Sequence, residues 1–399
     1  MPILPIGIAA GLSLFGDLTL FATLVTQLNT LHITLAEVGI LLSIHRFLRI
    51  PGNPLVGWIY DRFGRRKPFL VGMLLAVIST AAYGLVSGFW LFLVARLAWG
   101  AAWALINVGG MTMVLDVSTE ENRGRLNGIW NTLIWIGYAI GPLTGSILTD
   151  HIEFRPAMVV LAGLTSIGLV VALLFVRETR SSHLLQAGSN RLTIGQTFRA
   201  LFFSPSSSAS SASAIRKGMG LYSITTFTGD GVLMSTMTLL LTQLFGETIS
   251  LSGIVVGVAT ASGIFLAVRS VIGAVISPGI GRFSDRVGRI PVIASALVAG
   301  LLGAVLLVFA DSLGVILVGV ILGALSTGIG LVVIPAYVGD HTPTEKQGMV
   351  MGRLAMTGDI GNMLGPVLAF TLAPLAGLGW VYGLCILVFG IGLLLLRDA

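Results

Sequence analysis

The stretch GWIYDRFGRRKP, residues 57–68, places a carboxylate and a cluster of cations between two long apolar runs. A second stretch, GRFSDRVGRIP at 281–291, repeats much of the pattern. We call them the first and second charged turns. Elsewhere charge is scarce: 55% of the 399 residues are hydrophobic, only 10% are charged, and the mean hydropathy is +0.96. Soluble domains carry about 25% charged residues, so the expected solvent is lipid.

Polar breaks divide the chain into twelve apolar runs, each close to the roughly 20 residues that a membrane-spanning helix needs. We expect spans at 4–28, 36–60, 69–87, 90–115, 126–149, 155–176, 217–244, 251–280, 291–310, 312–338, 348–373 and 377–396. The sequence therefore predicts an all-α integral membrane protein with twelve transmembrane helices.

The loop cations indicate the orientation. With the N-terminus inside, the predicted cytoplasmic loops hold all of them except Arg155. This asymmetry is the positive-inside signal, and it predicts a multi-pass protein of the inner (plasma) membrane with both termini in the cytoplasm. The net charge of +6 is also compatible with nucleic-acid binding, but the placement of the cations argues against it.

The chain matches itself at an offset of 224 residues, and this match predicts two pseudo-symmetric six-helix bundles, a frequent plan among secondary transporters. The bundles are expected at 1–176 and 217–399, joined by a cytoplasmic linker at 177–216 whose Ser- and Ala-rich end is typical of a flexible tether. The matched pairs are Pro54/Pro278, Gly57/Gly281, Asp61/Asp285, Arg62/Arg286, Gly64/Gly288, Arg65/Arg289, Asp116/Asp340, Gly124/Gly348, Gly128/Gly352, Gly137/Gly361, Gly141/Gly365 and Pro142/Pro366.

These residues resemble the major facilitator superfamily. GWIYDRFGRR is similar to the loop signature of that family, and GRFSDRVGR is similar to a weaker copy, with Ile290 in place of Arg66. RLAWG at 96–100 resembles the intramembrane Arg motif. The resemblance implies the major facilitator fold and the twelve-helix drug:proton antiporter group. The motif associated with antiporters is matched in the fifth span, with Ser146 where the family usually has a glycine, by Gly128, Gly137, Gly141, Pro142 and Gly145.

By resemblance the first charged turn is a gate. Asp61 is expected to face the N-terminal end of the eleventh helix and Arg65 to pair with Asp116, which favours the outward-open state. A carboxylate beside a helix N-terminus gains about 0.3–1 kcal/mol. The simpler reading is that the cations anchor at anionic headgroups. The gating candidates in both turns are Gly57, Asp61, Arg62, Gly64, Arg65, Arg66, Asp116, Asp285, Arg289 and Asp340.

The fifth span carries two further patterns. Gly137, Gly141 and Gly145 share one helix face, where small residues allow close packing, and Pro142 bends the helix. Two readings remain open for this interface-packing motif: a seal between the two halves, or ordinary helix packing. Ordinary helix packing is also the alternative reading for the cavity-lining candidates, which are Asn131, Trp135 and Tyr138.

Charged residues inside the spans are expensive and usually line a cavity or form pairs. The carboxylates are our candidate proton carriers, because burial favours the neutral form; structural ion pairs are the alternative reading. The arginines can also hold an anionic substrate group. The candidates for proton coupling or substrate binding are Asp17, Arg46, Arg49, Arg96, Asp230 and Asp359, with Arg269 as a further buried cation.

The sequence therefore predicts a secondary active transporter working by alternating access, with proton-coupled efflux of a small, partly apolar compound. GxxxxGK[ST], HExxH and GxSxG motifs are missing from the sequence, so we expect no enzyme activity, metal or cofactor, and the proton gradient as energy source. Expected partners are a small-molecule substrate, protons and the lipid bilayer, with no nucleic acid and a monomeric state. Two alternatives remain: a uniporter or symporter for an anionic metabolite, and a non-transporting receptor or membrane-embedded enzyme.

Overall fold

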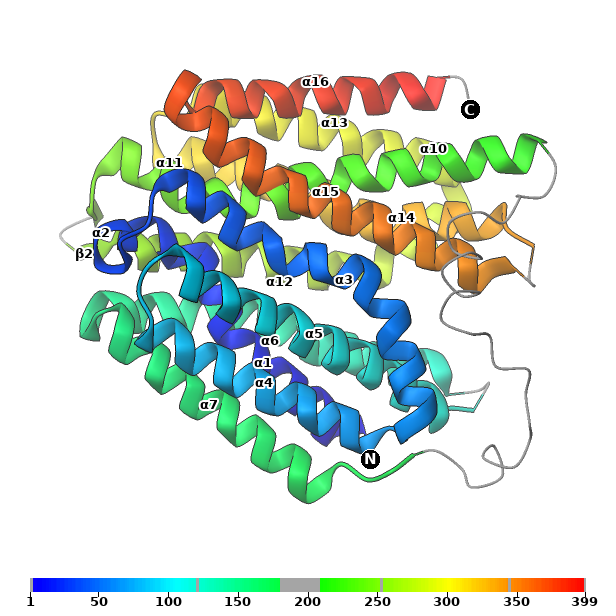
Figure 1. Ribbon diagram of the computed structural model, residues 1–399. Helices are drawn as coiled ribbons and strands as arrows, with labels where there is room; N and C mark the ends of the chain where they lie inside the picture. Colours follow the sequence, from blue (N-terminus) through cyan, green and yellow to red (C-terminus); the bar gives the residue numbers. More distant parts are fainter. Residues whose placement is uncertain (1–2, 120–121, 180–208, 252–253, 344–345, 398–399) are drawn as a thin grey trace.

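The computed structural model describes residues 3–119, 122–179, 209–251, 254–343 and 346–397, and within them the chain is a bundle of long helices (Figure 1). The first half contains α1 (Ile3–Thr23), a 3-10 turn (Leu24–Gln27), α2 (Leu28–Leu31), α3 (Leu35–Phe63), α4 (Arg66–Leu85), α5 (Phe89–Asp116), α6 (Arg123–Ile152) and α7 (Phe154–Phe175). The second contains α10 (Ala209–Thr226), a π-helical segment (Phe227–Leu233), α11 (Met234–Phe245), β1 (Thr248–Leu251), β2 (Ile254–Gly257), α12 (Val258–Val287), α13 (Arg289–Val308), α14 (Leu313–Asp340), α15 (Gln347–Ala376) and α16 (Leu378–Arg397).

Eleven helical segments among the described residues are long and apolar enough to cross a membrane. The twelfth long helix is α3, which has 29 residues and carries Arg46 and Arg49 in its middle. Large apolar side chains such as Leu91, Val94 and Leu387 are exposed on the outside of the bundle, where lipid covers them at no cost. The predicted twelve-helix, all-α membrane fold is confirmed.

Two element boundaries differ from the sequence prediction. The eighth span does not begin at residue 251, because Thr248–Leu251 and Ile254–Gly257 pair as a short antiparallel hairpin before α12 starts at Val258. The β-branched residues of TISL and IVVG favour strands, a preference that the apolar run concealed. Helix α10 starts at Ala209, inside the predicted linker; the predicted linker residues 180–208 lie outside the described part of the chain.

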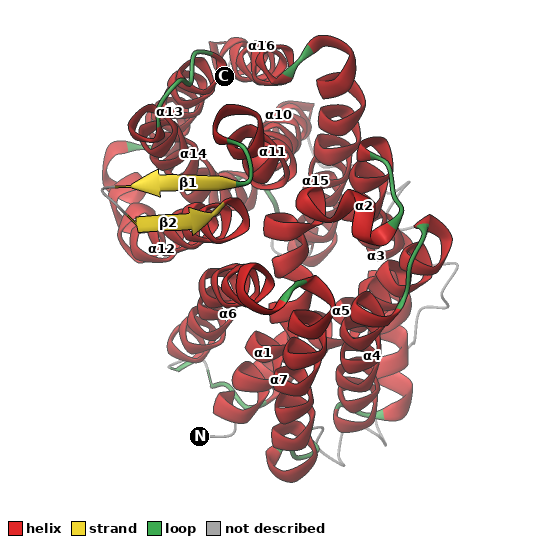
Figure 2. Cartoon of the chain, turned by 90° about the vertical axis from the view of Figure 1, so that its left-hand side faces the viewer, coloured by secondary structure: helices red, strands yellow, loops and turns green. Residues whose placement is uncertain are grey.

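The two ends of the bundle have distinct features. Because successive helices run in opposite directions, both charged turns lie at the same end as the two termini, which we call the turn end (Figure 1). The β1–β2 hairpin marks the opposite end, which we call the hairpin end, and Figure 2 looks onto it.

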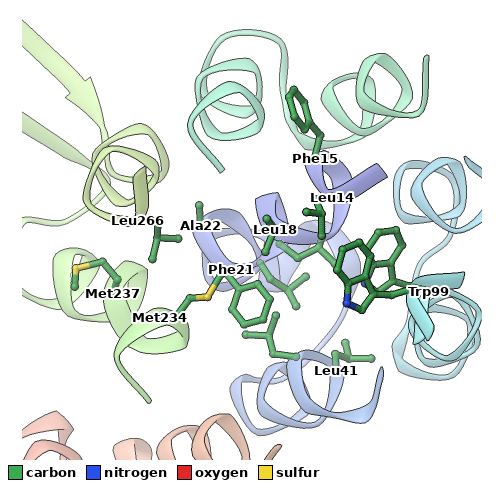
Figure 3. Packing of buried hydrophobic residues seen from close by; sticks show 14 of the residues in the cluster. Leu14, Phe15, Leu18, Phe21, Ala22, Leu41, Trp99, Met234, Met237 and Leu266 are labelled. Carbon is green, nitrogen blue, oxygen red and sulfur yellow. The ribbon is translucent and has the colours of Figure 1, made fainter. Parts of the chain in front are cut away.

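The halves meet along two helix pairs, α3 with α15 and α6 with α12, while α1 contacts α11 and α12. Helix α1 is buried along nearly all of its length, as expected for a helix that is apolar on every side. Figure 3 shows Phe21 and Ala22 of α1 beside Met234 of α11, with Leu266 of α12 close by. The apolar core is therefore continuous from one half to the other.

Candidate functional site

A cavity of about 240 Å³ lies between the halves, on the turn-end side of the middle of the bundle. Its lining combines charges, amides and aromatic rings, and both halves contribute. The lining residues are Arg46, Arg49, Trp103, Asn107, Ile134, Tyr138, Tyr222, Thr226, Asp230, Leu331, Ala355, Gly358, Asp359 and Asn362. Such a concave site with a few polar groups among apolar ones is the expected form of a small-molecule site.

Behind this cavity, Asp17 of α1 forms a buried ion pair with Arg96 of α5. The side chain of Arg96 is fully buried and Asp17 is 4% exposed. Arg96 is held by further contacts: its Nε donates to the Leu41 carbonyl oxygen at 2.7 Å, and its Nη2 lies 2.6 Å from His45 Nδ1. A guanidinium only donates, so His45 Nδ1 is the acceptor and the His45 ring is neutral.

A second, partly buried ion pair joins Asp230 and Arg269. Asp230 lies within the π-helical segment Phe227–Leu233 that interrupts the seventh span, and π-helical turns inside α-helices often occur at functional sites. Asp230 lines the cavity, whereas Asp17 lies behind it. The two halves thus each contain a carboxylate–arginine pair, but only the second half presents its carboxylate to the cavity.

A third pair crosses between the halves. Arg49 of α3 lies 3.3 Å from the carboxylate of Asp359 on α15, and both residues line the cavity. Breaking or forming this pair therefore changes how the two halves are held together.

The first charged turn is a compact network. Arg65 Nε donates to Asp116 Oδ2 at 2.9 Å, and Arg65 Nη1 lies 3.3 Å from Asp61 Oδ1. Burial opposes the charge of Arg65, but hydrogen bonds and attraction from Asp116 and Asp61 outweigh it and raise the pKa of Arg65. The cation therefore persists across the physiological pH range.

Sequence reasoning missed Glu178 in this network. Its carboxylate accepts hydrogen bonds from the backbone N–H groups of Arg65 (2.8 Å) and Arg66 (3.1 Å) at the start of α4. A carboxylate at a helix N-terminus satisfies unpaired N–H groups and complements the helix dipole. These hydrogen bonds hold the segment after α7 against the first charged turn. No local sequence motif predicts this contact.

The second charged turn repeats this geometry. Arg289 Nε donates to Asp340 Oδ2 at 3.0 Å, and Arg289 Nη2 lies 2.6 Å from Asp285 Oδ1. This network is more open, since the side chain of Asp340 is 53% exposed against 17% for its counterpart Asp116. Exposed ion pairs contribute less.

Of the two readings left open for the glycines of the fifth span, the positions match packing within one half. A Cβ on Gly137 would lie 2.7 Å from the Gly11 carbonyl oxygen, and one on Gly141 would lie 3.2 Å from the Phe15 Cα, both on α1. A Cβ on Gly145 would meet the side chain of Thr19 on the same helix. These three glycines therefore pack against α1 of their own half, whereas Pro142 of the same motif lies at the contact with α12 of the other half.

The contact between halves uses two other glycines, which sequence reasoning missed. A Cβ on Gly263 of α12 would lie 2.8 Å from the carbonyl oxygen of Pro142 on α6, and one on Gly39 of α3 would lie 2.8 Å from that of Pro366 on α15. Gly39 and Gly263 are themselves 224 residues apart, as are Pro142 and Pro366. The offset could have revealed this symmetric pair of close approaches.

Hydrogen bonds reinforce the contact from the middle of the bundle to the hairpin end. The Thr238 hydroxyl donates to the carbonyl oxygens of Phe21 and Ala22, and the Thr260 N–H donates to Asp150 at 2.8 Å. These bonds join the two halves between the middle of the bundle and the hairpin end.

The three cavity-lining candidates of the fifth span lie in three different environments. Tyr138 lines the cavity. Trp135 instead packs near Gly273 of α12, and Asn131 is exposed, with its amide donating to the Asn127 carbonyl oxygen. The lining residues Trp103, Asn107, Tyr222, Thr226 and Asn362 were not predicted, since aromatic and amide residues in an apolar run carry no signal of which way they face.

A repeated bundle of helices around a charged central cavity defines a secondary transporter of the membrane. The chain belongs to the Major Facilitator Superfamily: the sequence model of that family matches residues 6–276 and 219–398.

The curated relatives that match over most of this chain include resistance proteins. The tetracycline resistance protein, class C, of Escherichia coli is 25% identical over 360 residues, which cover 87% of this chain and 84% of that protein. The multidrug resistance protein Stp of Mycobacterium tuberculosis is 24% identical over 338 residues, which cover 76% of this chain and 63% of that protein. The relatedness to drug-resistance members of the family is thus supported by similarity over most of the chain.

Solved structures share the fold. The human organic anion transporter MFSD10 superposes with a TM-score of 0.70 at 18% identity, covering 99% of this chain and 98% of that one. A bacterial homolog of the human lysosomal transporter Spinster, in its inward-facing and occupied conformation, gives a TM-score of 0.74 at 15% identity, covering 99% of this chain and 95% of that one.

Proposed function

We propose that the protein exports a small, partly apolar compound in exchange for protons, by alternating access. The observation that carries this proposal is the set of three buried or partly buried carboxylate–arginine pairs, Asp17–Arg96, Asp230–Arg269 and Asp359–Arg49, at and behind a cavity between the halves. The tetracycline and multidrug resistance relatives support export of a drug-like molecule.

The carboxylates are the proton carriers in this proposal. A carboxylate paired with arginine in a site poor in water gives up the pairing energy when it is protonated. Proton binding therefore frees an arginine and changes what the cavity attracts. At Asp359 it also weakens the contact between α3 and α15, so that protonation and the arrangement of the halves become linked.

The turn end faces the cytoplasm in this proposal, because the loop cations gather there. The hairpin-end contacts then close the outer side, and the cavity lies toward the cytoplasm, where an exporter collects its substrate. Closing the turn end and opening the hairpin end completes the cycle by rocking of the two halves.

The available energy is sufficient. One charge moved through 100 mV supplies about 2.3 kcal/mol, and one pH unit adds about 1.4 kcal/mol. Their sum, about 3.7 kcal/mol, holds a concentration ratio of several hundred for a neutral solute exchanged one-for-one.

The direct test uses purified protein in proteoliposomes with an imposed pH gradient and a panel of tetracycline, ethidium and an anionic anilinonaphthalene dye. We expect the gradient to drive uphill movement of at least one probe, and a proton ionophore to abolish it. A folded protein that moves none of them, with or without a gradient, contradicts the transporter proposal and favours a receptor or an embedded enzyme.

The first charged turn is proposed to act as a gate at the turn end. Asp61→Asn is expected to lower transport up to about fivefold while leaving expression and thermal unfolding unchanged, because its side chain is 67% exposed and removing its charge weakens closure of that end by up to about 1 kcal/mol. Initial transport rates in proteoliposomes measure the effect. The matched control is Asp311→Asn, an exposed carboxylate in the turn before α14, and wild-type rates from Asp61→Asn would rule out the gating role.

A further inference from the structure

Arg46 is the unusual cation of the cavity. It is 7% exposed and lines the cavity wall from α3. The neighbouring arginines Arg49, Arg96 and Arg269 each pair with an aspartate, whereas among the described residues Arg46 takes part in no ion pair within 4 Å. Its Nη1 is buried without a hydrogen-bond partner in the described structure.

The charges of Asp230 and Asp359 attract Arg46, but its direct contacts among the described residues are weak. Its guanidinium lies 5.9 Å from the centre of the Phe21 ring, and its Nε lies 3.4 Å from His45 Nε2. The Nδ1 of His45 already accepts from Arg96, so a neutral His45 carries its hydrogen on Nε2 and offers Arg46 no lone pair. A buried guanidinium left without an acceptor is costly, and an anion entering the cavity removes that cost.

Helix α15, which packs against α3, offers the complementary chemistry. Asn362 of α15 lines the same cavity, and its side-chain oxygen is a buried acceptor without a donor among the described residues. Asp359 lies three positions earlier and therefore on the same helix face, and Asp230 also lines the cavity. An N–H or ammonium group fits here.

The rest of the cavity lining includes apolar and aromatic side chains, among them Trp103, Ile134, Tyr222 and Leu331. They suit the flat, partly apolar body of a small molecule. The charges of the four arginines and three aspartates leave one positive charge in surplus, and that charge belongs to Arg46.

We infer that the substrate is a zwitterionic, aromatic or apolar small molecule whose anionic group binds Arg46 and whose N–H or ammonium group binds Asn362 beside Asp359. This assignment rests on the proposed transport function and names the substrate class of the same cavity. It also links binding to protons, because an ammonium group and a proton compete for the carboxylates of the second half.

Three probes that share one ring system test the inference by equilibrium dialysis, at a single pH and without any gradient: naphthylalanine, its methyl ester, and naphthylpropanoate. The ester lacks the anion and the propanoate lacks the amine. We expect the wild-type protein to bind naphthylalanine at least about tenfold more tightly than either analogue, which corresponds to about 1.4 kcal/mol, the low end for a hydrogen bond to a charged group.

The variants assign each end of the probe. In Arg46→Gln the preference over the ester is expected to vanish, Arg46→Lys is expected to retain part of it, and in Asn362→Leu only the preference over the propanoate is expected to vanish. The control is Arg282→Gln, which removes an exposed cation from the end of α12. Thermal unfolding identifies any variant that fails to fold, and the Lys variant then carries the comparison.

Equal binding of naphthylalanine and its ester by the wild-type protein, an unchanged preference in Arg46→Gln, or no binding of any probe at millimolar concentration overturns the inference. Its failure is distinguishable from that of the proposed function. A protein that binds with the expected preferences but shows no pH-driven flux refutes proton-coupled export alone. A protein that exports but prefers the ester refutes the zwitterion assignment alone.

Discussion

Valine at both Gly39 and Gly263 is expected to abolish transport, lowering the initial rate about a hundredfold or more. Even the Cβ atoms of these side chains would lie 2.8 Å from the carbonyl oxygens of Pro366 and Pro142. Backbone oxygens cannot rotate away, so the two halves have to separate. Overpacking costs about 1–3 kcal/mol at each site, which at about 1.4 kcal/mol per tenfold gives the stated loss when both contacts are filled.

The matched control fills space on the same two helices without a collision. A Cβ on Gly52 of α3 or on Gly279 of α12 meets nothing within 4 Å, so Gly52→Val with Gly279→Val is expected to transport normally. Single alanines at Gly39 or Gly263 are expected to give intermediate rates.

The mechanism behind the loss can be measured separately. Ser262 is fully buried and its hydroxyl contacts Thr238 near the hairpin end. In a Cys385→Ala background, a cysteine at 262 is expected to react with a water-soluble maleimide at least about tenfold faster in the double-valine variant, which reflects a bias of about 1.4 kcal/mol towards the state open at the hairpin end. Wild-type transport by the double-valine variant, or unchanged labelling, would contradict the role given to these contacts.

Arg96→Gln is expected to produce the largest loss of stability, about 3–5 kcal/mol of unfolding free energy, because it leaves the buried Asp17 carboxylate without its partner. Denaturant titration of the purified protein in micelles measures it. The exposed Arg125→Gln serves as the control and is expected to change the stability by less than about 0.5 kcal/mol. Adding Asp17→Asn to Arg96→Gln is expected to recover part of the loss, since the two side chains interact directly; equal stabilities of the two single glutamine variants would show that the pair contributes nothing.

The fold was predictable because its signals are local or repeat along the chain. Apolar runs of bilayer length predict the helices, and the repetition of Asp61, Arg65 and Asp116 as Asp285, Arg289 and Asp340 predicts two similar halves. The β1–β2 hairpin was missed because its eight residues are as apolar as the helix that follows them.

The candidate site was predictable only in part. A charge inside a span is visible in the sequence, so all three aspartates of these pairs and their arginines were named. The sequence does not say which arginine pairs with which aspartate, because that depends on how α1, α5, α12 and α15 are packed. Among the described residues, Arg46 forms no ion pair because the other three arginines take the aspartates. This follows from the packing and is not visible in the sequence.

The same limit applies to the glycines. Their spacing indicates a close helix contact, but Gly137 and Gly141 face α1 of their own half, while Gly39 and Gly263 meet the partner half. The side on which a small residue finds its neighbour is a property of the assembled bundle. Symmetry could have selected Gly39 and Gly263 as a pair, although not their partners.

The central claim is that protons exchanged at the buried carboxylates drive export, and substrate accumulation against a gradient tests it most directly. In proteoliposomes with an imposed difference of about one pH unit, the wild-type protein is expected to concentrate its probe about tenfold. Asp17→Asn and Asp230→Asn, which cannot bind and release a proton, are expected to lower this ratio towards one while still exchanging probe down its gradient. Wild-type accumulation in both variants would contradict the account.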